Sequence, residues 1–445
     1  MIAALTTLGD AAQTAGVVAA ALLAAGVLLG IGALLIHRRP ELLALAAAGA
    51  LPFRVPIESG GDTANLLVPL YLVIAAGALA YALPRLRSPR GLEDIERGDA
   101  REVPHERGLL EWLLAGAIVL YAVQATYSSD FDRALAQTIF FYVPFALLFA
   151  LLVRIRWTPQ LAGRCLIVLL VLAAAFVAIG FVEYGKRELL LNPKVIASNQ
   201  FESYFRVNSL FFDPNIYGRF LVTVMLSVVA VLLWSRRQAL VAACAAGLVL
   251  LWAGLVLTLS QSSFTALLVG LTVLGALRWG IGRAAALVGG FAIVGIVAVL
   301  AAPSAVGVEG AADNVSSGRW SLVRGGVEIA AEKPVAGWGS AAFKTEYRAR
   351  QDSSSERASA ASHTIPITVA AEQGLGGLAL YLALVVVAIA TLLRGARRSI
   401  ARAAVAAAFV ALVVHTLLYA AFLEDPLAWA LLALGVALAP AASEP

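Results

Sequence analysis

The stretch "IPITVAAEQGLGGLALYLALVVVAIATLL" (residues 365–393) is apolar over nearly its whole length and contains one charged residue, Glu372. A helix needs roughly 20 such residues to cross the ~30 Å hydrocarbon core of a bilayer. Similar runs recur along the chain, which is 61% hydrophobic and only 14% charged over 445 residues. A soluble protein of this length carries far more charge. The sequence therefore predicts an all-α, polytopic membrane protein.

The apolar runs predict about 12–13 transmembrane helices. The candidate spans are residues 13–36, 41–53, 65–84, 108–126, 133–153, 163–183, 215–234, 239–258, 260–277, 284–302, 365–393, 403–422 and 426–440. The run at 41–53 is short, so we leave open whether it spans. The first run is too long for a signal peptide and lacks a cleavage site, so we expect none. Cys165 and Cys244 lie within apolar runs without metal or redox spacing, which favours a packing role.

Arginine placement predicts the orientation of these spans. Alternate loops contain "HRRP", "RLRSPR", "RIRW", "SRRQ", "RWGIGR" and "RGARRSIAR". Short loops rich in arginine stay in the cytoplasm, so we expect these loops there. The long polar segments 184–213 and 303–363 then lie on the extracytoplasmic face. The arginines form no basic patch with interleaved aromatics, so nothing supports nucleic-acid binding.

The first long segment ends in "DPN", which is typical of a helix start. Asp213 is the expected N-cap and Pro214 the first helical residue, and Asn215 and Tyr217 follow in the first turn. The amino end of a helix carries partial positive charge, which favours an anion such as phosphate. The same start recurs as "DPL" at residues 425–427.

The second long segment predicts a helix that lies along the membrane surface. Ser316 or Ser317 is the expected cap of a helix that begins near Arg319 and stops before Pro334. Its apolar face is expected to consist of Trp320, Val323, Val327 and Ala330. A turn is expected at "GWG", residues 337–339.

His363 stands where this polar segment meets the apolar run that begins at residue 365. Thr364 is expected to cap that helix, so His363 is predicted at its outer end. Arginine suits bidentate phosphate binding, and a histidine near neutral pKa can take a proton from a hydroxyl group. Arg206, Arg319 and His363 therefore suggest hydroxyl attack on a lipid-linked phosphate ester. Taken singly, each arginine also fits a contact with lipid headgroups, and His363 also fits an ordinary loop residue.

Two other residues enter as alternatives to His363. Glu372 is a rival base on the same helix, although a polar packing contact is the expected role. His415 lies within the span 403–422, where we expect a packing role.

The sequence resembles the O-antigen ligase and O-antigen polymerase family of bacterial envelopes. The resemblance rests on ordered motifs within residues 201–430: "FRVNSLFFDPNIYGRFL", "LTLSQSSFTALLVGL", "SGRWSLVRGGVEIAAEKPVAGWGSAAF", "SHTIPITVAAEQGLGGL" and "HTLLY…DPLAW". It implies functional roles for the arginine before the "PN" helix, the arginine that opens the loop helix and the histidine after the loop. These match Arg206, Arg319 and His363 here.

Two positions depart from the family pattern. Ser260 is followed by Gln261 where the family often has arginine, and His363 is followed by Thr364 where the family often has asparagine. Gln261 either lines the site or belongs to a small-residue packing contact between helices. We expect Asn215, Tyr217 and Gln261 to support the site.

The resemblance implies a metal-independent glycosyltransferase without a cofactor, in the bacterial inner membrane. Its donor would be a glycan on undecaprenyl diphosphate, and its acceptor a hydroxyl group of a glycan, lipid or protein. We assign residues 1–183 to N-terminal transmembrane helices and 184–445 to the catalytic core. No DxD-like pair lies on the predicted outer face to hold a metal.

Two other classes of function remain as alternatives. One is a transporter or flippase of lipid-linked sugars, which the near absence of charge within the spans disfavours. The other is a non-catalytic scaffold of a polysaccharide export complex. Ligase and polymerase differ only in the acceptor, so both interpretations stay open, as does the oligomeric state.

Overall fold

The computed structural model of the chain describes residues 23–59, 62–87, 108–190, 205–286, 289–290, 311–350, 364–419 and 421–438. At 55–59, 62–65, 83–87 and 311–321 only the backbone is described. The chain forms two compact units, one of Met1–Pro104 with Arg154–Arg156, and one of His105–Val153 with Trp157–Pro445.

The first unit combines helices with one β-hairpin. It contains the helical stretch Leu23–Arg38, α2 (Glu41–Ala50), β1 (Val55–Ser59), β2 (Asp62–Leu66) and α3 (Val68–Arg87). The strands pair antiparallel, with Val55 opposite Leu66 and Ser59 opposite Asp62. The hairpin was not predicted from the sequence, where residues 65–84 were assigned to one span.

The second unit holds the remaining described helices. They are α5 (Leu109–Ala125), α6 (Phe131–Gln137), the π-helical turn η1 (Thr138–Tyr142), α7 (Val143–Val153), α8 (Pro159–Lys186), α10 (Pro214–Trp234), α11 (Gln238–Thr258), α12 (Gln261–Trp279), α14 (Ala311–Glu332), α15 (Phe343–Arg350), α16 (Ile365–Leu393), η4 (Ala396–Arg398), α17 (Ile400–Leu418) and α18 (Pro426–Ala437).

The prediction of an all-α, polytopic membrane protein is confirmed. Among the described residues, seven helices are long and apolar enough to cross a membrane: Phe131–Val153, α8, α10, α11, α12, Ile365–Arg398 and α17. Five shorter apolar helices accompany them. One of these is α2, whose 10 residues extend only about 15 Å. Its length is thus about half of what a bilayer requires. Most of the expected span 284–302 lies outside the described residues.

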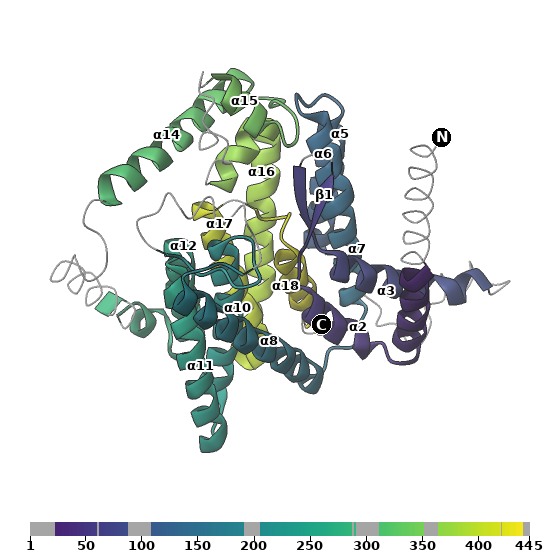
Figure 1. Ribbon diagram of the computed structural model, residues 1–445, viewed down its shortest axis with the longest axis vertical. Coiled ribbons are helices and arrows are strands. Elements are labelled where there is room, and N and C mark those ends of the chain that lie inside the picture. Colours follow the sequence, from purple (N-terminus) through teal and green to yellow (C-terminus); the bar gives the residue numbers. More distant parts are fainter. Residues whose placement is uncertain are drawn as a thin grey trace, which may run out of the picture. The chain divides into compact units, whose positions relative to one another are not determined.

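Helices α10 and α17 form the centre of the second unit. In the most apolar 18-residue stretch of each helix, 72% is buried inside the protein, against 22–39% in the other five spans. Both helices pack on each other, and α12 packs on both (Figure 1). Alanine lines much of α17, with Ala403, Ala406, Ala407 and Ala408 at most 1% exposed. Small side chains let the backbones of neighbouring helices approach closely.

The helix in the second long segment is longer than predicted. Helix α14 begins at Ala311, so Ser316 and Ser317 lie inside it and neither is its cap. Its end before Pro334 agrees with the prediction.

The face of α14 that packs on the protein is offset from the apolar face predicted to lie along the membrane, and that membrane contact stays a prediction. Leu322 and Ile329 are buried in a cluster with Phe343 and Tyr347, whereas Val327 is 53% exposed. The protein-facing stripe is thus offset from Val323 and Val327. The stripe is offset because α14 packs on α15 and α16, which the sequence pattern did not reveal.

The segment after α14 fits tightly against a kink in α16. Gly374 has φ +67° within α16, and Leu375 N donates to Pro334 O at 2.7 Å. Gly337 also has a positive φ, and a Cβ there would lie 2.2 Å from Glu372 O. Only glycine fits both positions without strain.

The second compact unit begins earlier in the chain than residue 184, where the catalytic core assigned from the sequence begins. Helices α5, α7 and α8 all begin before residue 184, yet they pack on α16, α18 and α11 respectively. The assignment of catalysis to 184–445 stays a proposal.

Candidate functional site

Asp213 and Pro214 begin α10 as the sequence predicted. Asp213 Oδ1 accepts a hydrogen bond from Asn215 N at 2.6 Å, and Pro214 is the first helical residue. The side chain of Asn215 then points to two partners. Its Oδ1 accepts from Arg206 Nη2 at 3.0 Å and from the Ser260 hydroxyl at 2.8 Å. The first turn of α10 is therefore a junction of three segments.

Arg206 joins that junction to the end of α11. Its Nε donates to Thr258 O at 3.0 Å, and the neighbouring Val207 N donates to Leu257 O at 3.0 Å. Together with the bond to Asn215, these contacts fix the plane of the guanidinium group. The group is held at the amino end of α10, where helix dipoles favour anions.

Three serines at the start of α12 extend the network. Ser260 caps α12, and its hydroxyl lies 3.1 Å from that of Ser262 and 2.8 Å from that of Ser263. Helix α10 comes very close here, since a Cβ at Gly218 would lie 2.4 Å from Ser263 Oγ. The glycine therefore permits the contact between α10 and α12.

His415, near the end of α17, contacts serine hydroxyls through one ring nitrogen and Arg219 through the other. Its Nε2 lies 3.1 Å from Ser262 Oγ and 3.2 Å from Ser263 Oγ, and Arg219 Nε donates to its Nδ1 at 3.2 Å. A guanidinium group can only donate, so Nδ1 accepts. The ring proton then lies on Nε2 and is directed at the serines.

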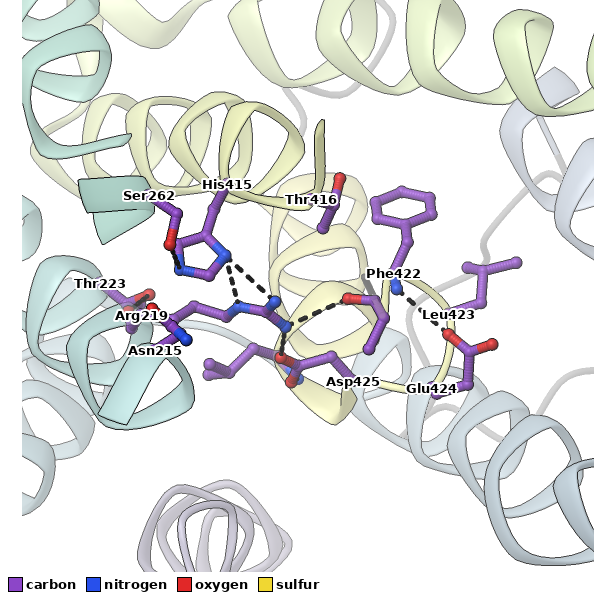
Figure 2. A network of polar contacts seen from close by, with 12 residues as sticks. Asn215, Arg219, Thr223, Ser262, His415, Thr416, Phe422, Leu423, Glu424 and Asp425 are labelled. Carbon is purple, nitrogen blue, oxygen red and sulfur yellow. Dashed lines mark hydrogen bonds and ion pairs between the residues drawn. The ribbon is translucent and has the colours of Figure 1, made fainter. Parts of the chain in front are cut away.

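Arg219 completes the network with a buried ion pair to Asp425. Figure 2 shows its guanidinium group between His415 and the loop before α18. Nη1 also donates to Ala421 O at 3.1 Å, and Asp425 Oδ1 caps α18 through Leu427 N at 2.9 Å. Arg219 and Asp425 are 2% and 4% exposed. Removing one partner of such a pair leaves an uncompensated buried charge.

We call these residues the polar cluster: Arg206, Asn215, Arg219, Ser260, Ser262, Ser263, His415 and Asp425. The amino ends of α10, α12 and α18 all contribute to it. The guanidinium group of Arg206 and three helix amino ends bring full and partial positive charge to one place, while Asp425 offsets the charge of Arg219. Such an arrangement can bind a phosphate-bearing group.

The structure brings two of the residues expected in the site together, Arg206 and Asn215. Tyr217 is instead buried, with its ring stacked on Phe211 at 5.3 Å between centroids. Gln261, at the start of α12, is exposed. Arg319 lies on α14, but its side chain is outside the described part, as is the whole of His363. Their convergence with Arg206 stays a prediction.

His415 and Arg219 were missed as site residues. We expected a packing role for His415, yet both its ring nitrogens make polar contacts. The spans are also less free of charge than expected, because Glu183, Arg219 and Arg402 are buried within them. Each makes hydrogen bonds within the protein, although Arg402 Nε is buried without a partner. Sparse charge therefore no longer counts against the transporter alternative. The signal in the sequence that could have identified Arg219 and His415 is that both are ionisable residues within apolar runs.

Glu372 has the packing contact expected for it. Its Oε1 accepts from Phe343 N at 3.1 Å, which ties α16 to the start of α15. Nearby, the Trp338 ring contacts two cations, with Lys333 Nζ 3.6 Å and Arg350 Cζ 4.8 Å from its centroid. Arg350 also bonds Glu332, and this hydrogen bond lowers the pKa of the Glu332 carboxyl below its usual value.

Comparison with protein families confirms the resemblance predicted from the sequence. Residues 222–382 match the family described as O-Antigen ligase. The match includes the serines of the polar cluster as well as Arg319 and His363, while Arg206 and Arg219 precede it and His415 and Asp425 follow it. A comparison with curated proteins gave no match.

Proposed function

Because the match at residues 222–382 supports the O-antigen ligase and polymerase family, we propose that the chain is an inverting glycosyltransferase. It moves a glycan from an undecaprenyl-diphosphate donor to a hydroxyl acceptor. The reaction takes place on the extracytoplasmic face of the bacterial inner membrane. We infer the extracytoplasmic face because the arginine-rich loops are expected on the opposite, cytoplasmic side.

The observation that supports this function best is the fixed position of Arg206. Its guanidinium group is bonded to Asn215 in the first turn of α10 and to Thr258 at the end of α11. A diphosphate leaving group develops charge as its bond to the sugar breaks, and preorganised donors stabilise such charge strongly. Arginine and helix amino ends can do this without a divalent ion, so metal independence is part of the proposal.

We assign the role of general base to His363. The next residue, Thr364, donates from Oγ1 to Leu417 O at 3.3 Å, and Leu417 is two positions after His415. The chain therefore enters α16 beside the end of α17 that carries the polar cluster. Arg319 on α14 supplies a second guanidinium group for the diphosphate in this proposal.

The proposed step balances as a single displacement. The acceptor oxygen attacks the anomeric carbon from the face opposite the diphosphate, and its proton passes to His363. The new glycosidic C–O bond forms while the bond from the anomeric carbon to the phosphate oxygen breaks. The products are the elongated or ligated glycan and undecaprenyl diphosphate, with the anomeric configuration inverted.

A transfer assay on purified protein with a lipid-linked donor tests this function. We expect His363→Ala to slow transfer about 10²–10⁴-fold, as loss of a general base does. Glu372→Gln tests the rival base, because glutamine keeps an oxygen that can accept from Phe343 N but cannot take a proton from the acceptor. The base assignment is wrong if the glutamate variant is inactive while the histidine variant keeps its rate. If neither variant loses activity, or the wild type transfers nothing, the glycosyltransferase proposal fails.

A further inference from the structure

A pocket lies between α5, η1, α16 and the loop before α18, and the polar cluster does not use it. It encloses about 560 Å³ of empty space, part of which is open at its mouth. We call it the Glu424 pocket, and its main lining residues are Tyr121, Tyr142, Glu372, Tyr381, Phe422 and Glu424.

Aromatic rings form much of the wall of the Glu424 pocket. Tyr121 and Tyr142 stack with 4.1 Å between ring centroids, and Tyr381 meets the edge of Phe422 at 5.7 Å. Tyr121 donates its hydroxyl to Gln137, which fixes the first ring pair. These rings are only 2–7% exposed, so the wall that they form is apolar and fixed by packing.

Two carboxyl groups supply the polar side of the same pocket. Glu424 Oε2 accepts from Phe422 N at 3.1 Å, and Glu372 Oε1 accepts from Phe343 N at 3.1 Å. Each carboxylate has about four acceptor positions, so its backbone bonds do not exhaust it. Burial raises the pKa of the Glu424 carboxyl above its usual value, which makes protonation easier. A protonated carboxyl donates as well as accepts, which suits a ligand with several hydroxyl groups.

The loop 421–425 connects this pocket to the polar cluster. Ala421 O and Asp425 contact Arg219, while Figure 2 shows Glu424 on the side of the loop away from Arg219. Ile365 and Thr368, in the first turn of α16, also line the pocket. Ile365 is two positions after the proposed base, His363. The pocket therefore adjoins the proposed reaction site, on the opposite side of the loop from Arg219.

We propose that the Glu424 pocket binds one sugar ring of the acceptor glycan. The ring fits against the tyrosine side chains and donates hydroxyl hydrogens to Glu424 and Glu372. The acceptor is favoured over the donor because the pocket begins at the first turn of α16, next to the proposed base. The assignment to the acceptor rests on the proposed function, whereas sugar binding by the pocket does not.

Photo-crosslinking tests sugar binding without any transfer reaction. The full chain, in a sugar-free polyoxyethylene detergent, is exposed to glucosyl, galactosyl, rhamnosyl and N-acetylglucosaminyl probes that carry a diazirine alkyl arm. The same alkyl diazirine without a sugar is the control. We expect at least one sugar probe to label peptides from 117–142 and 365–384 in preference to the control. Equal labelling by the sugar-free probe, or none by any sugar, overturns the proposal.

Variants make the test specific to this pocket. Glu424→Gln should weaken sugar labelling about tenfold, while Glu332→Gln, an exposed glutamate on α14, should leave it unchanged. Ala117→Phe fills the pocket without removing a polar group and should abolish labelling. If sugar labelling is unchanged in both Glu424→Gln and Ala117→Phe, the proposal is contradicted, even where one of the two variants folds poorly.

Transfer kinetics then separate acceptor from donor. For an acceptor subsite, Glu424→Gln raises the KM for the acceptor and leaves the KM for the lipid-linked donor unchanged. A rise in the donor KM alone assigns the ring to the donor and refutes the acceptor proposal. If labelling succeeds while no variant or wild type transfers, the pocket assignment stands and the proposed function fails.

Discussion

Helix α17 carries a buried arginine contact at each end, and the two contacts differ in their partners. At its start, Arg402 donates to the carbonyl oxygens of Thr391, Arg394 and Gly435. Near its end, His415 accepts from Arg219, which pairs with Asp425. The two ends are 13 residues apart (415 − 402), which is about 20 Å along the helix.

The partners indicate different roles for the two ends. Carbonyl oxygens neither titrate nor carry net charge, so Arg402 ties the end of α16 and α18 to α17 without offering chemistry. In the part of the chain that the structure describes, its guanidinium group contacts no carboxylate. The other end combines a carboxylate, an imidazole, hydroxyls and two guanidinium groups within hydrogen-bond reach. We therefore assign stability to the first end and propose that substrate binding is centred on the second.

The largest effect is expected from Arg219→Ala. The change leaves the buried carboxylate of Asp425 without its partner, which typically costs about 3–5 kcal/mol of unfolding free energy. His415 also loses the donor that fixes its ring tautomer. Thermal unfolding in detergent should show a large fall in Tm, and the transfer rate should fall with it.

The double variant Arg219→Met with Asp425→Asn provides the control for this prediction. It removes both charges, so it should recover much of the stability that the single variant loses. Transfer should stay low in the double variant, because the geometry at His415 is not restored. Full recovery of transfer would show that Arg219 acts on stability alone and that the two ends of α17 do not differ as we infer.

A smaller effect is expected from Arg402→Met. Methionine keeps an apolar stem but leaves the carbonyl oxygens without a donor, at a cost of about 1–3 kcal/mol. Tm should fall, whereas the transfer rate per folded molecule should stay near the wild-type value. A loss of transfer larger than the loss of folded protein would mean that this end also serves the reaction.

The smallest effect concerns the exposed pair of Glu332 with Arg350. Arg350 holds the pKa of Glu332 below the usual value of 4.5. A lowered folded-state pKa adds stability above about pH 4.5, and that stability is lost as the pH falls through the folded pKa. Wild type should therefore exceed Glu332→Gln in Tm at pH 7 by more than at pH 4. A difference that is constant between the two pH values would contradict this account.

Local patterns in the sequence predicted several helix starts correctly. The Asp-Pro pairs at 213–214 and 425–426 each begin a helix, with the aspartate as cap. These signals depend on neighbours within three residues, so the sequence alone carries them. The same logic failed at Ser316, because α14 begins five residues earlier, at Ala311.

The polar cluster could not be predicted in the same way. Its contacts join Arg219 to His415 and Asp425, which are 196 and 206 positions further along the chain. No local pattern encodes such distances. The family resemblance singled out Arg206 because it precedes a recognisable motif, but His415 was assigned to packing. An ionisable residue inside an apolar span was the physical signal that deserved more weight.

Binding of undecaprenyl diphosphate tests the central claim most directly. Native mass spectrometry can compare the wild type with Arg206→Gln, which keeps a side-chain donor for Asn215, and with Arg237→Ala, an exposed arginine between α10 and α11. A charge-assisted contact contributes about 1.5–3 kcal/mol, so losing it should weaken binding about tenfold or more. We predict this loss for Arg206→Gln and no change for Arg237→Ala. Equal affinity of all three proteins would contradict a diphosphate site at Arg206.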